Sequence, residues 1–212
     1  MMAKAPPLDK RRQILDAAIR VFARQGFHST RVSDIADEAG VAYGLVYHYF
    51  ESKDHVLNEL FSERWSLLLA AIEEADREAA SAREKLATVA SFIVDSYRHD
   101  PDLMKVIVVE VTRAANSFGR THLAEISRAY EMIAKIVADG QDSEEFRADV
   151  DPFFASMWFY GAIEQLLSAW VFDLLPGAHG DFEHAKEMVV ETICGGLEAR
   201  PAGAGKPSRD GA

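Results

Sequence analysis

The sequence predicts an all-α protein. Apolar residues recur along most of the chain at the three-to-four spacing of one helix face, and no strand-like alternation of useful length interrupts them. Glycine and proline separate these patterns, as at Asp100-Pro101 and Pro176-Gly177. The chain has 212 residues, of which 49% are hydrophobic, so it can bury a full-sized core without disulfides.

The first three predicted helices follow one another closely. Asp9 can cap the first helix, and Gly26 is its expected left-handed stop. Thr30 is the expected N-cap of a short second helix. A tight turn at residues 40–42 then leads into a short third helix over about 43–50.

Longer helices make up the rest of the chain. Ser52 can cap a fourth helix over about 54–77. Five further helices are expected over 82–98, 101–116, 119–139, 151–172 and 181–198, and Gly140 is expected to open the break before the fourth of these. We therefore predict disordered ends and two domains, with bounds 1–8 (disordered), 9–53 (N-terminal domain), 54–200 (C-terminal domain) and 201–212 (disordered).

The charge is divided unevenly between these domains. The chain carries 34 acidic and 23 basic residues, for a net charge of −11. Residues 1–53 hold eight Lys/Arg and six Asp/Glu, whereas residues 54–212 hold fifteen and twenty-eight. This asymmetry indicates a DNA-facing end on an acidic body, or simply a solvated acidic surface.

The composition also limits the compartment. One cysteine excludes a disulfide framework and a cysteine-based zinc site, and it fits a reducing cytosol. No uncharged apolar run approaches the roughly 20 residues of a membrane span, and the N-terminus has no signal-peptide pattern. We expect a cytoplasmic protein that makes no membrane contact.

The third helix is the most informative segment. Two short helices joined by a glycine-bearing turn form a helix-turn-helix, whose second helix enters the major groove of DNA. On a helical wheel this helix has a polar arc of Tyr43, Gly44, Tyr47 and His48, and an apolar arc of Leu45, Val46, Tyr49 and Phe50. The alternative is that these tyrosines only pack a helical hairpin.

The polar arc supplies groups that suit DNA. Gly44 allows a close approach of the backbone, because it has no Cβ. The hydroxyl of Tyr47 and the ammonium of Lys53 suit phosphate oxygens, and Thr30 can add a further hydroxyl at a helix N-terminus. The side chains best placed to meet base edges are Tyr43 and His48.

This segment resembles the DNA-binding domain of the tetracycline-repressor (TetR) family of bacterial regulators. The matching features are Ile14-Leu15-Asp16-Ala17-Ala18, Phe22, Gly26-Phe27, Thr30, Ile35-Ala36, Ala39-Gly40-Val41, Tyr47-His48-Tyr49-Phe50, Ser52-Lys53 and Leu57. The resemblance implies a homodimeric transcription factor, usually a repressor, whose helical body dimerises and holds a ligand cavity. It also implies DNA contacts at Thr30, Tyr43, Gly44, Leu45, Tyr47, His48, Tyr49 and Lys53.

Two residues depart from the family pattern. Ala42, beside the other DNA-binding candidates, stands where many members have Ser or Thr, so the recognition helix lacks a side-chain cap worth about 1 kcal/mol. Tyr43 stands where a smaller or charged residue is common. The operator sequence therefore does not transfer from the family.

The helix over 151–172 predicts a dimer interface. It is apolar on nearly every side, which is typical of a helix buried against its own core and against a partner chain. With the last helix it can form a two-fold four-helix interface, for which the candidates are Met157, Gly161, Ile163, Leu167, Trp170, Met188, Ile193 and Leu197. The alternative is a core helix of a monomer.

The helices before it are expected to enclose an effector cavity. The candidate apolar walls are Phe92, Ile93, Tyr97, Met104, Ile107, Val108, Val111, Tyr130, Ile133, Trp158 and Phe159, although any one of them can be plain core. Three polar residues, Glu110, Arg113 and Asn116, lie on an apolar helix. Glu110 and Arg113 can pair within the helix, or Arg113 can meet an anionic group of a ligand.

The body is also similar to the fatty-acid-degradation regulators of the TetR family. The shared features are Arg83-Glu84-Lys85-Leu86-Ala87, the three polar residues just named, and Gly161, Ile163 and Trp170. This similarity implies that a long-chain acyl-coenzyme A is the effector and that it releases the operator DNA. The alternatives are a regulator of efflux or of another pathway that answers to a different hydrophobic molecule, and a helical lipid carrier that binds no DNA.

An enzyme is not expected. The sequence contains no H-E-x-x-H, G-x-S-x-G, P-loop or G-x-G-x-x-G motif. The pairs His122/Glu125 and Glu183/His184 have no recognised catalytic spacing, and such pairs on helices are usually solvated. We expect no metal and no cofactor.

Overall fold

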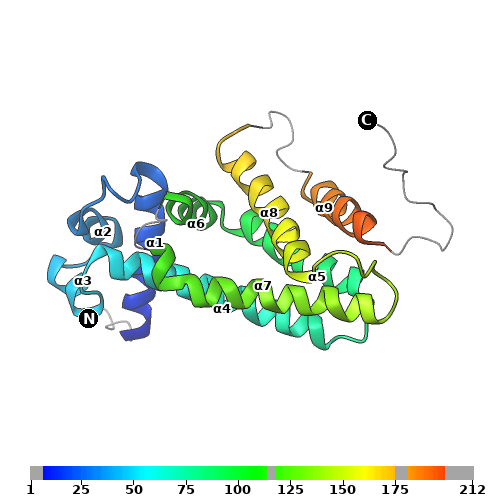
Figure 1. Ribbon diagram of the computed structural model, residues 1–212. Coiled ribbons are helices and arrows are strands. Elements are labelled where there is room, and N and C mark those ends of the chain that lie inside the picture. The colour runs from blue at the N-terminus through cyan, green and yellow to red at the C-terminus, as the bar shows by residue number, and fades with distance from the viewer. Residues whose placement is uncertain (1–6, 114–117, 175–180, 199–212) are drawn as a thin grey trace, which may run out of the picture.

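The helical fold class is confirmed. The computed structural model describes the backbone of residues 7–113, 118–174 and 181–198, and the side chains of residues 10–109, 122–174 and 181–198. The helices within these ranges are α1 (Pro7–Gln25), α2 (Val32–Ala39), α3 (Tyr43–Tyr49), α4 (Lys53–Arg77), α5 (Ala82–His99), α6 (Pro101–Arg113), α7 (Phe118–Asp142), α8 (Pro152–Val171) and α9 (Phe182–Leu197) (Figure 1).

Two hydrophobic cores organise the molecule. Helices α1 to α3 gather at one end, and the long helix α4 runs from them into the body formed by α5 to α9 (Figure 1). The first core contains side chains of α1 to α3 together with Leu57 and Leu60 of α4 and Val106 of α6. The second core lies among α4 to α9 and begins at Phe61 of α4. Helix α4 therefore belongs to both cores.

The ends of the first two helices differ from the prediction at two points. Helix α1 begins at Pro7 rather than at Asp9, which is consistent with the preference of proline for a first helical turn. Gly26 is left-handed as predicted, with φ +81°. The N-cap of α2 is Arg31 and not Thr30, because a carboxylate oxygen of Asp34 accepts the Arg31 backbone N–H at 2.8 Å.

The cap of α4 agrees with the prediction. The Ser52 hydroxyl accepts the backbone N–H of His55 at 3.1 Å, and α4 begins at Lys53. Asp151 caps α8 in the same way, because one of its carboxylate oxygens accepts the N–H groups of Phe153 and Phe154. These caps fix where α4 and α8 begin.

Gly140 does not end its helix, and that prediction is wrong. Helix α7 continues through it to Asp142. A Cβ at this position would lie 2.6 Å from Phe146 Cδ2 and 2.7 Å from Ala82 Cβ. Gly140 is therefore needed where the buried Phe146 ring and the first turn of α5 press against α7.

Candidate functional site

The helix-turn-helix is held by a left-handed glycine. Gly40 has φ +61°, and the backbone N–H groups of Gly40 and Val41 return to the carbonyls of Asp37 and Ala36 at the end of α2. Helix α3 then packs on α2 and contributes Val46 to the first core, with Phe50 buried just beyond it. The other residues of α3 are exposed or half-buried, so one face of this helix is free to contact another molecule.

The exposed face of α3 is the polar arc predicted from the wheel. Tyr43 and Tyr47 are 53% and 46% exposed, and Ala42, Gly44 and His48 are exposed beside them. A Cβ built on Gly44 meets nothing within 4 Å, so the packing of this chain does not require a glycine there. Leu45 and Tyr49 are half-buried, which agrees with their place on the inner arc.

The two exposed tyrosines form a pair. The Tyr43 hydroxyl donates to the Tyr47 hydroxyl at 3.2 Å, and their rings meet edge to face with centroids 5.1 Å apart. The hydrogen bond with Tyr43 raises the pKa of Tyr47. A phenol is protonated at neutral pH even without such a shift, so the Tyr47 hydroxyl can donate to an anion. The rings of His48 and Tyr49 meet edge to face, with their centroids 4.9 Å apart.

Thr30 and Lys53 are engaged within the chain. Thr30 is only 2% exposed, and its hydroxyl donates to the carbonyl of Gly26 at 2.8 Å. The Lys53 ammonium donates to the carbonyls of Phe27 at 2.8 Å and Thr30 at 2.9 Å, and to that of His28 at 3.2 Å. Both residues clamp the segment between α1 and α2 onto the start of α4, a role that their sequence positions did not reveal.

Most arginines near the helix-turn-helix form ion pairs with carboxylates of the same chain. Arg20 and Arg24 both bind Glu38, and these hydrogen bonds lower the pKa of that carboxyl. Arg11 and Arg12 bind carboxylates of α4 and so tie α1 to it. Arg31 differs: it is exposed and has no carboxylate within 4 Å among the described residues. Arg31 was not among the predicted DNA-binding residues, although it immediately precedes α2.

The body contains an apolar cavity of about 170 Å³. Helices α4 to α8 supply its walls, which are Arg64, Trp65, Leu68, Ile93, Met104, Ile107, Val108, Ile126, Tyr130, Tyr160, Glu164 and Leu167. Five predicted walls are among them, namely Ile93, Met104, Ile107, Val108 and Tyr130. Arg64 and Glu164 were not predicted from the sequence, although Arg64 follows the inward spacing of Phe61 and Leu68 on α4.

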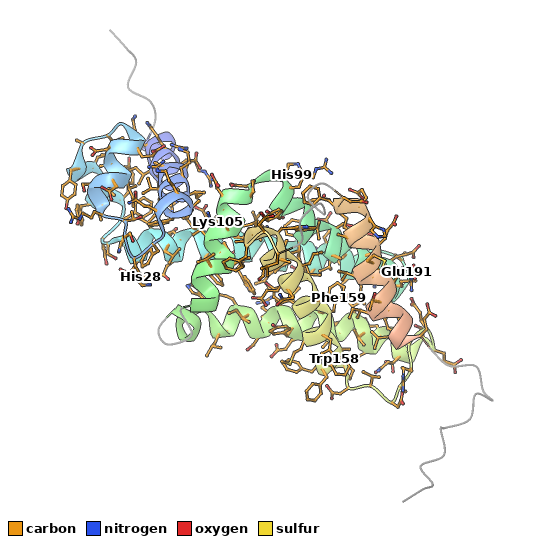
Figure 2. All side chains as sticks on the ribbon, turned by 90° about the horizontal axis from the view of Figure 1, so that it is seen from above. His28, His99, Lys105, Trp158, Phe159 and Glu191 are labelled. Carbon is orange, nitrogen blue, oxygen red and sulfur yellow. The ribbon has the colours of Figure 1, made fainter. Side chains whose placement is uncertain are left out.

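The other described wall candidates lie elsewhere. Tyr97 stacks on Trp170, and Phe92 lies under the guanidinium of Arg64. The remaining three are Ile133 and Phe159, which are fully buried in solid core, and Trp158, which is 58% exposed. Figure 2 shows Trp158 at the outer edge of the molecule and Phe159 inside it. The side chains of Glu110, Val111, Arg113 and Asn116 lie outside the described residues.

Polar groups interrupt the apolar cavity wall. Arg64 is 9% exposed, and burial lowers the pKa of its guanidinium. Burial raises the pKa of the Glu164 carboxyl, so its neutral form is favoured more than in water. The hydroxyls of Tyr130 and Tyr160 also have raised pKa values, mainly through burial. The cavity can thus hold an apolar ligand that carries a polar end.

Helices α8 and α9 share a groove on the opposite side of α8. It measures about 670 Å³, and its wall includes Leu166, Met188 and Ile193. Of the predicted interface residues, Met157 and Met188 are exposed, and Gly161 and Ile193 are half-buried. Ile163, Leu167 and Leu197 instead belong to the protomer's own core, and Trp170 forms the floor of the groove while being 3% exposed.

The described residues also bear on the expectations about membranes and metals. None of the helices in the described ranges combines the length and the apolar character needed to cross a bilayer. Nor do the described side chains place three or more histidine, cysteine or acidic groups together as metal ligands would be.

Comparisons with known proteins cover most of the chain. Residues 14–60 match "Bacterial regulatory proteins, tetR family", and residues 61–191 match "YsiA-like protein, C-terminal region". The "Fatty acid metabolism regulator protein" of Bacillus subtilis (strain 168) is 36% identical over 160 residues, which is 75% of this chain and 82% of that protein.

Solved structures resemble the fold over nearly its full length. The fatty acid degradation regulator FadR from Bacillus halodurans has a TM-score of 0.81 and 27% identity, covering 93% of this chain and all of that one. The transcriptional regulator FadR from Bacillus subtilis in complex with stearoyl-CoA has a TM-score of 0.78 and 29% identity, covering 88% of this chain and 99% of that one.

Proposed function

Because the chain belongs to the TetR family of bacterial regulatory proteins, we propose that it is a homodimeric repressor that a long-chain acyl-coenzyme A releases from its operator. As a transcriptional regulator of this family the chain is not an enzyme. The observation that carries the proposal is an exposed tyrosine-rich face on α3, held apart from a body that contains an apolar cavity.

The DNA-binding face is assigned to the exposed side of α3. Tyr43 and His48 suit base edges in the major groove, and the protonated hydroxyl of Tyr47 suits a phosphate. Gly44 suits close backbone contact, because nothing of the chain fills the space where its Cβ would be. Arg31, at the N-terminus of α2, adds an exposed cation that forms no ion pair within 4 Å among the described residues, although its charge helps to lower the pKa of Asp34.

The dimer interface is assigned to the exposed faces of α8 and α9. Trp158, Met157 and Met188 are large apolar side chains that a protomer alone leaves in water. Gly161 has no neighbour within 4 Å of its Cβ position, so a partner helix can approach closely there. Two such faces related by a two-fold axis form a four-helix interface that presents two recognition helices to two half-sites.

The effector is assigned to the body cavity. The fold of the relative crystallised with stearoyl-CoA matches 88% of this chain, which favours a fatty acyl thioester as the effector. The alternative is a different hydrophobic molecule that acts on another pathway, because an apolar cavity alone does not select a thioester. The regulator is expected to work in the cytoplasm, where both acyl-coenzyme A and DNA are present.

The test is fluorescence anisotropy on labelled DNA from upstream of the protein's own gene, titrated with palmitoyl- or oleoyl-coenzyme A. The proposal expects a complex that micromolar acyl-coenzyme A dissolves, below the concentration at which the lipid acts as a detergent. A complex that neither compound moves would leave a repressor with another effector. A protein that binds no duplex above non-specific background at moderate salt, yet binds the lipid, would be a carrier.

A further inference from the structure

The effector cavity contains a buried cation whose hydrogen-bonding capacity the described residues leave largely unused. Arg64 lines the cavity and is 9% exposed. Its Nε donates to the Met104 sulfur at 3.4 Å, and its guanidinium lies 4.8 Å from the centre of the Phe92 ring. A thioether is a weak acceptor, and a guanidinium has five N–H donors. Among the described residues no oxygen accepts from them, and no carboxylate lies within 4 Å.

Such an arrangement is costly unless something offsets it. A buried charge normally has a partner, because its removal from water is unfavourable. The neighbours of Arg64 on the inner face of α4 are the apolar residues Phe61, Trp65 and Leu68, so an apolar side chain would suit this position for packing alone. An unpaired buried cation in a cavity indicates a binding role rather than a structural one.

The other groups around the cavity do not neutralise this charge. Glu164 of α8 lines the same cavity without forming an ion pair with Arg64, and burial favours its neutral form. Tyr130 and Tyr160 keep protonated hydroxyls. Asp100 acts on Arg64 only through a longer-range Coulomb interaction. The cavity is therefore complementary to a ligand atom that accepts hydrogen bonds.

We propose that Arg64 binds the oxygen at the polar end of the effector's acyl chain, either a thioester carbonyl or a free carboxylate. This inference rests on the proposed acyl effector. The volume of about 170 Å³ is close to that of an engineered apolar cavity of 150 Å³ that holds one benzene. The cavity as it stands therefore takes the oxygen-bearing end and the first few carbons, and the rest of a long chain must displace wall side chains.

A pair of ligands that differ in one oxygen tests the proposal. Palmitoyl-coenzyme A and S-hexadecyl-coenzyme A, its thioether analogue, differ only in the carbonyl oxygen. By isothermal titration calorimetry the wild-type protein is expected to prefer the thioester by roughly 10- to 100-fold, the range for one hydrogen bond to a charged group. Arg64→Met is expected to bind both compounds equally, and Arg64→Lys to keep part of the preference.

The control is Arg83→Met, an identical replacement outside the cavity. Arg83 binds Glu191 and Glu198 at the surface between α5 and α9, so its loss should leave the ligand preference unchanged. The thermal midpoint of Arg64→Met without ligand should not fall, because the variant removes a buried unpaired charge. If that variant fails to fold, the wild-type preference and its reduction in Arg64→Lys decide the question.

Failure of this inference differs from failure of the proposed function. Equal affinity of the wild type for both coenzyme A compounds would refute the role of Arg64 and leave acyl-coenzyme A as the effector. A preference that survives in Arg64→Met would also refute it. If the wild type binds palmitate but neither coenzyme A compound, and Arg64→Met weakens palmitate binding, then the oxygen anchor stands and the coenzyme A assignment fails.

Discussion

Replacing Gly140 with alanine is expected to destabilise the protein, although alanine is the better helix former. In the last turn of α7 this exchange would gain at most about 1 kcal/mol from helix propensity alone. The new methyl group, however, would lie 2.6 Å from a Phe146 ring carbon and 2.7 Å from the Ala82 Cβ. The alanine methyl cannot rotate away, and the Phe146 ring is buried.

The net magnitude follows from these opposing effects. Overpacking a core costs about 1–3 kcal/mol, and two rigid neighbours place this site near the upper end. After subtraction of the propensity gain, about 2 kcal/mol of destabilisation remains, which for a chain of this size lowers the thermal midpoint by about 4–8 °C. The measurement is thermal unfolding followed by circular dichroism at 222 nm, at one fixed protein concentration.

Gly44→Ala is the matched control, because Gly44 lies in a helix where a Cβ meets nothing within 4 Å. That variant should keep or raise the thermal midpoint while it weakens binding to operator DNA. A thermal midpoint of Gly140→Ala equal to or above the wild-type value would refute the close approach of α7, α5 and Phe146. An equal loss in both variants would show that the contacts with Phe146 and Ala82 are not the cause of the destabilisation.

Four further perturbations separate the roles assigned above. Tyr47→Phe should weaken operator binding about tenfold by anisotropy with unchanged thermal stability, because it removes one phosphate donor; a loss of stability instead would assign the hydroxyl a structural role. Lys53→Met should cost about 1–3 kcal/mol and speed hydrogen exchange between α1 and α2, because three carbonyls lose their donor; unchanged exchange would contradict the clamp. Met188→Glu should dissociate the dimer in analytical ultracentrifugation, and a persistent dimer would move the interface elsewhere. Glu164→Gln should stabilise the ligand-free protein at pH 8 but not below pH 4.5, the ordinary glutamate pKa. Burial raises the pKa of this carboxyl, so its charged form destabilises the fold as the pH rises, and glutamine removes that charge. An equal change in stability at both pH values would refute this account.

The order of the helices was predictable from the sequence because the apolar residues of a buried helix face recur at a fixed spacing. On α3 the wheel also separated the exposed Tyr43 and Tyr47 from the buried Val46. Gly140 was misassigned because one glycine serves equally as a helix stop and as a close-packing site, and only the position of Phe146 distinguishes them.

The interior sites were harder to predict for a related reason. Ile133 and Ile107 have the same chemistry, and only the packing of five helices decides that Ile107 meets a cavity while Ile133 meets solid core. On α8 the excess of apolar residues was visible, but a helix with two apolar faces does not reveal which face turns inward. The clamp by Lys53 was hidden because its partners are backbone carbonyls, which have no sequence signature.

The two cores share helices α4 and α6, and this sharing affects the cooperativity of folding. Leu57 and Leu60 of α4 and Val106 of α6 complete the core around α1 to α3, while Phe61 and Ile107, on the same two helices, belong to the body. A fragment that ends before α4 would leave the first core open, so the N-terminal end and the body are expected to unfold in one transition. A ligand bound in the body then also protects the DNA-binding end against unfolding and proteolysis, even in the state that has left DNA.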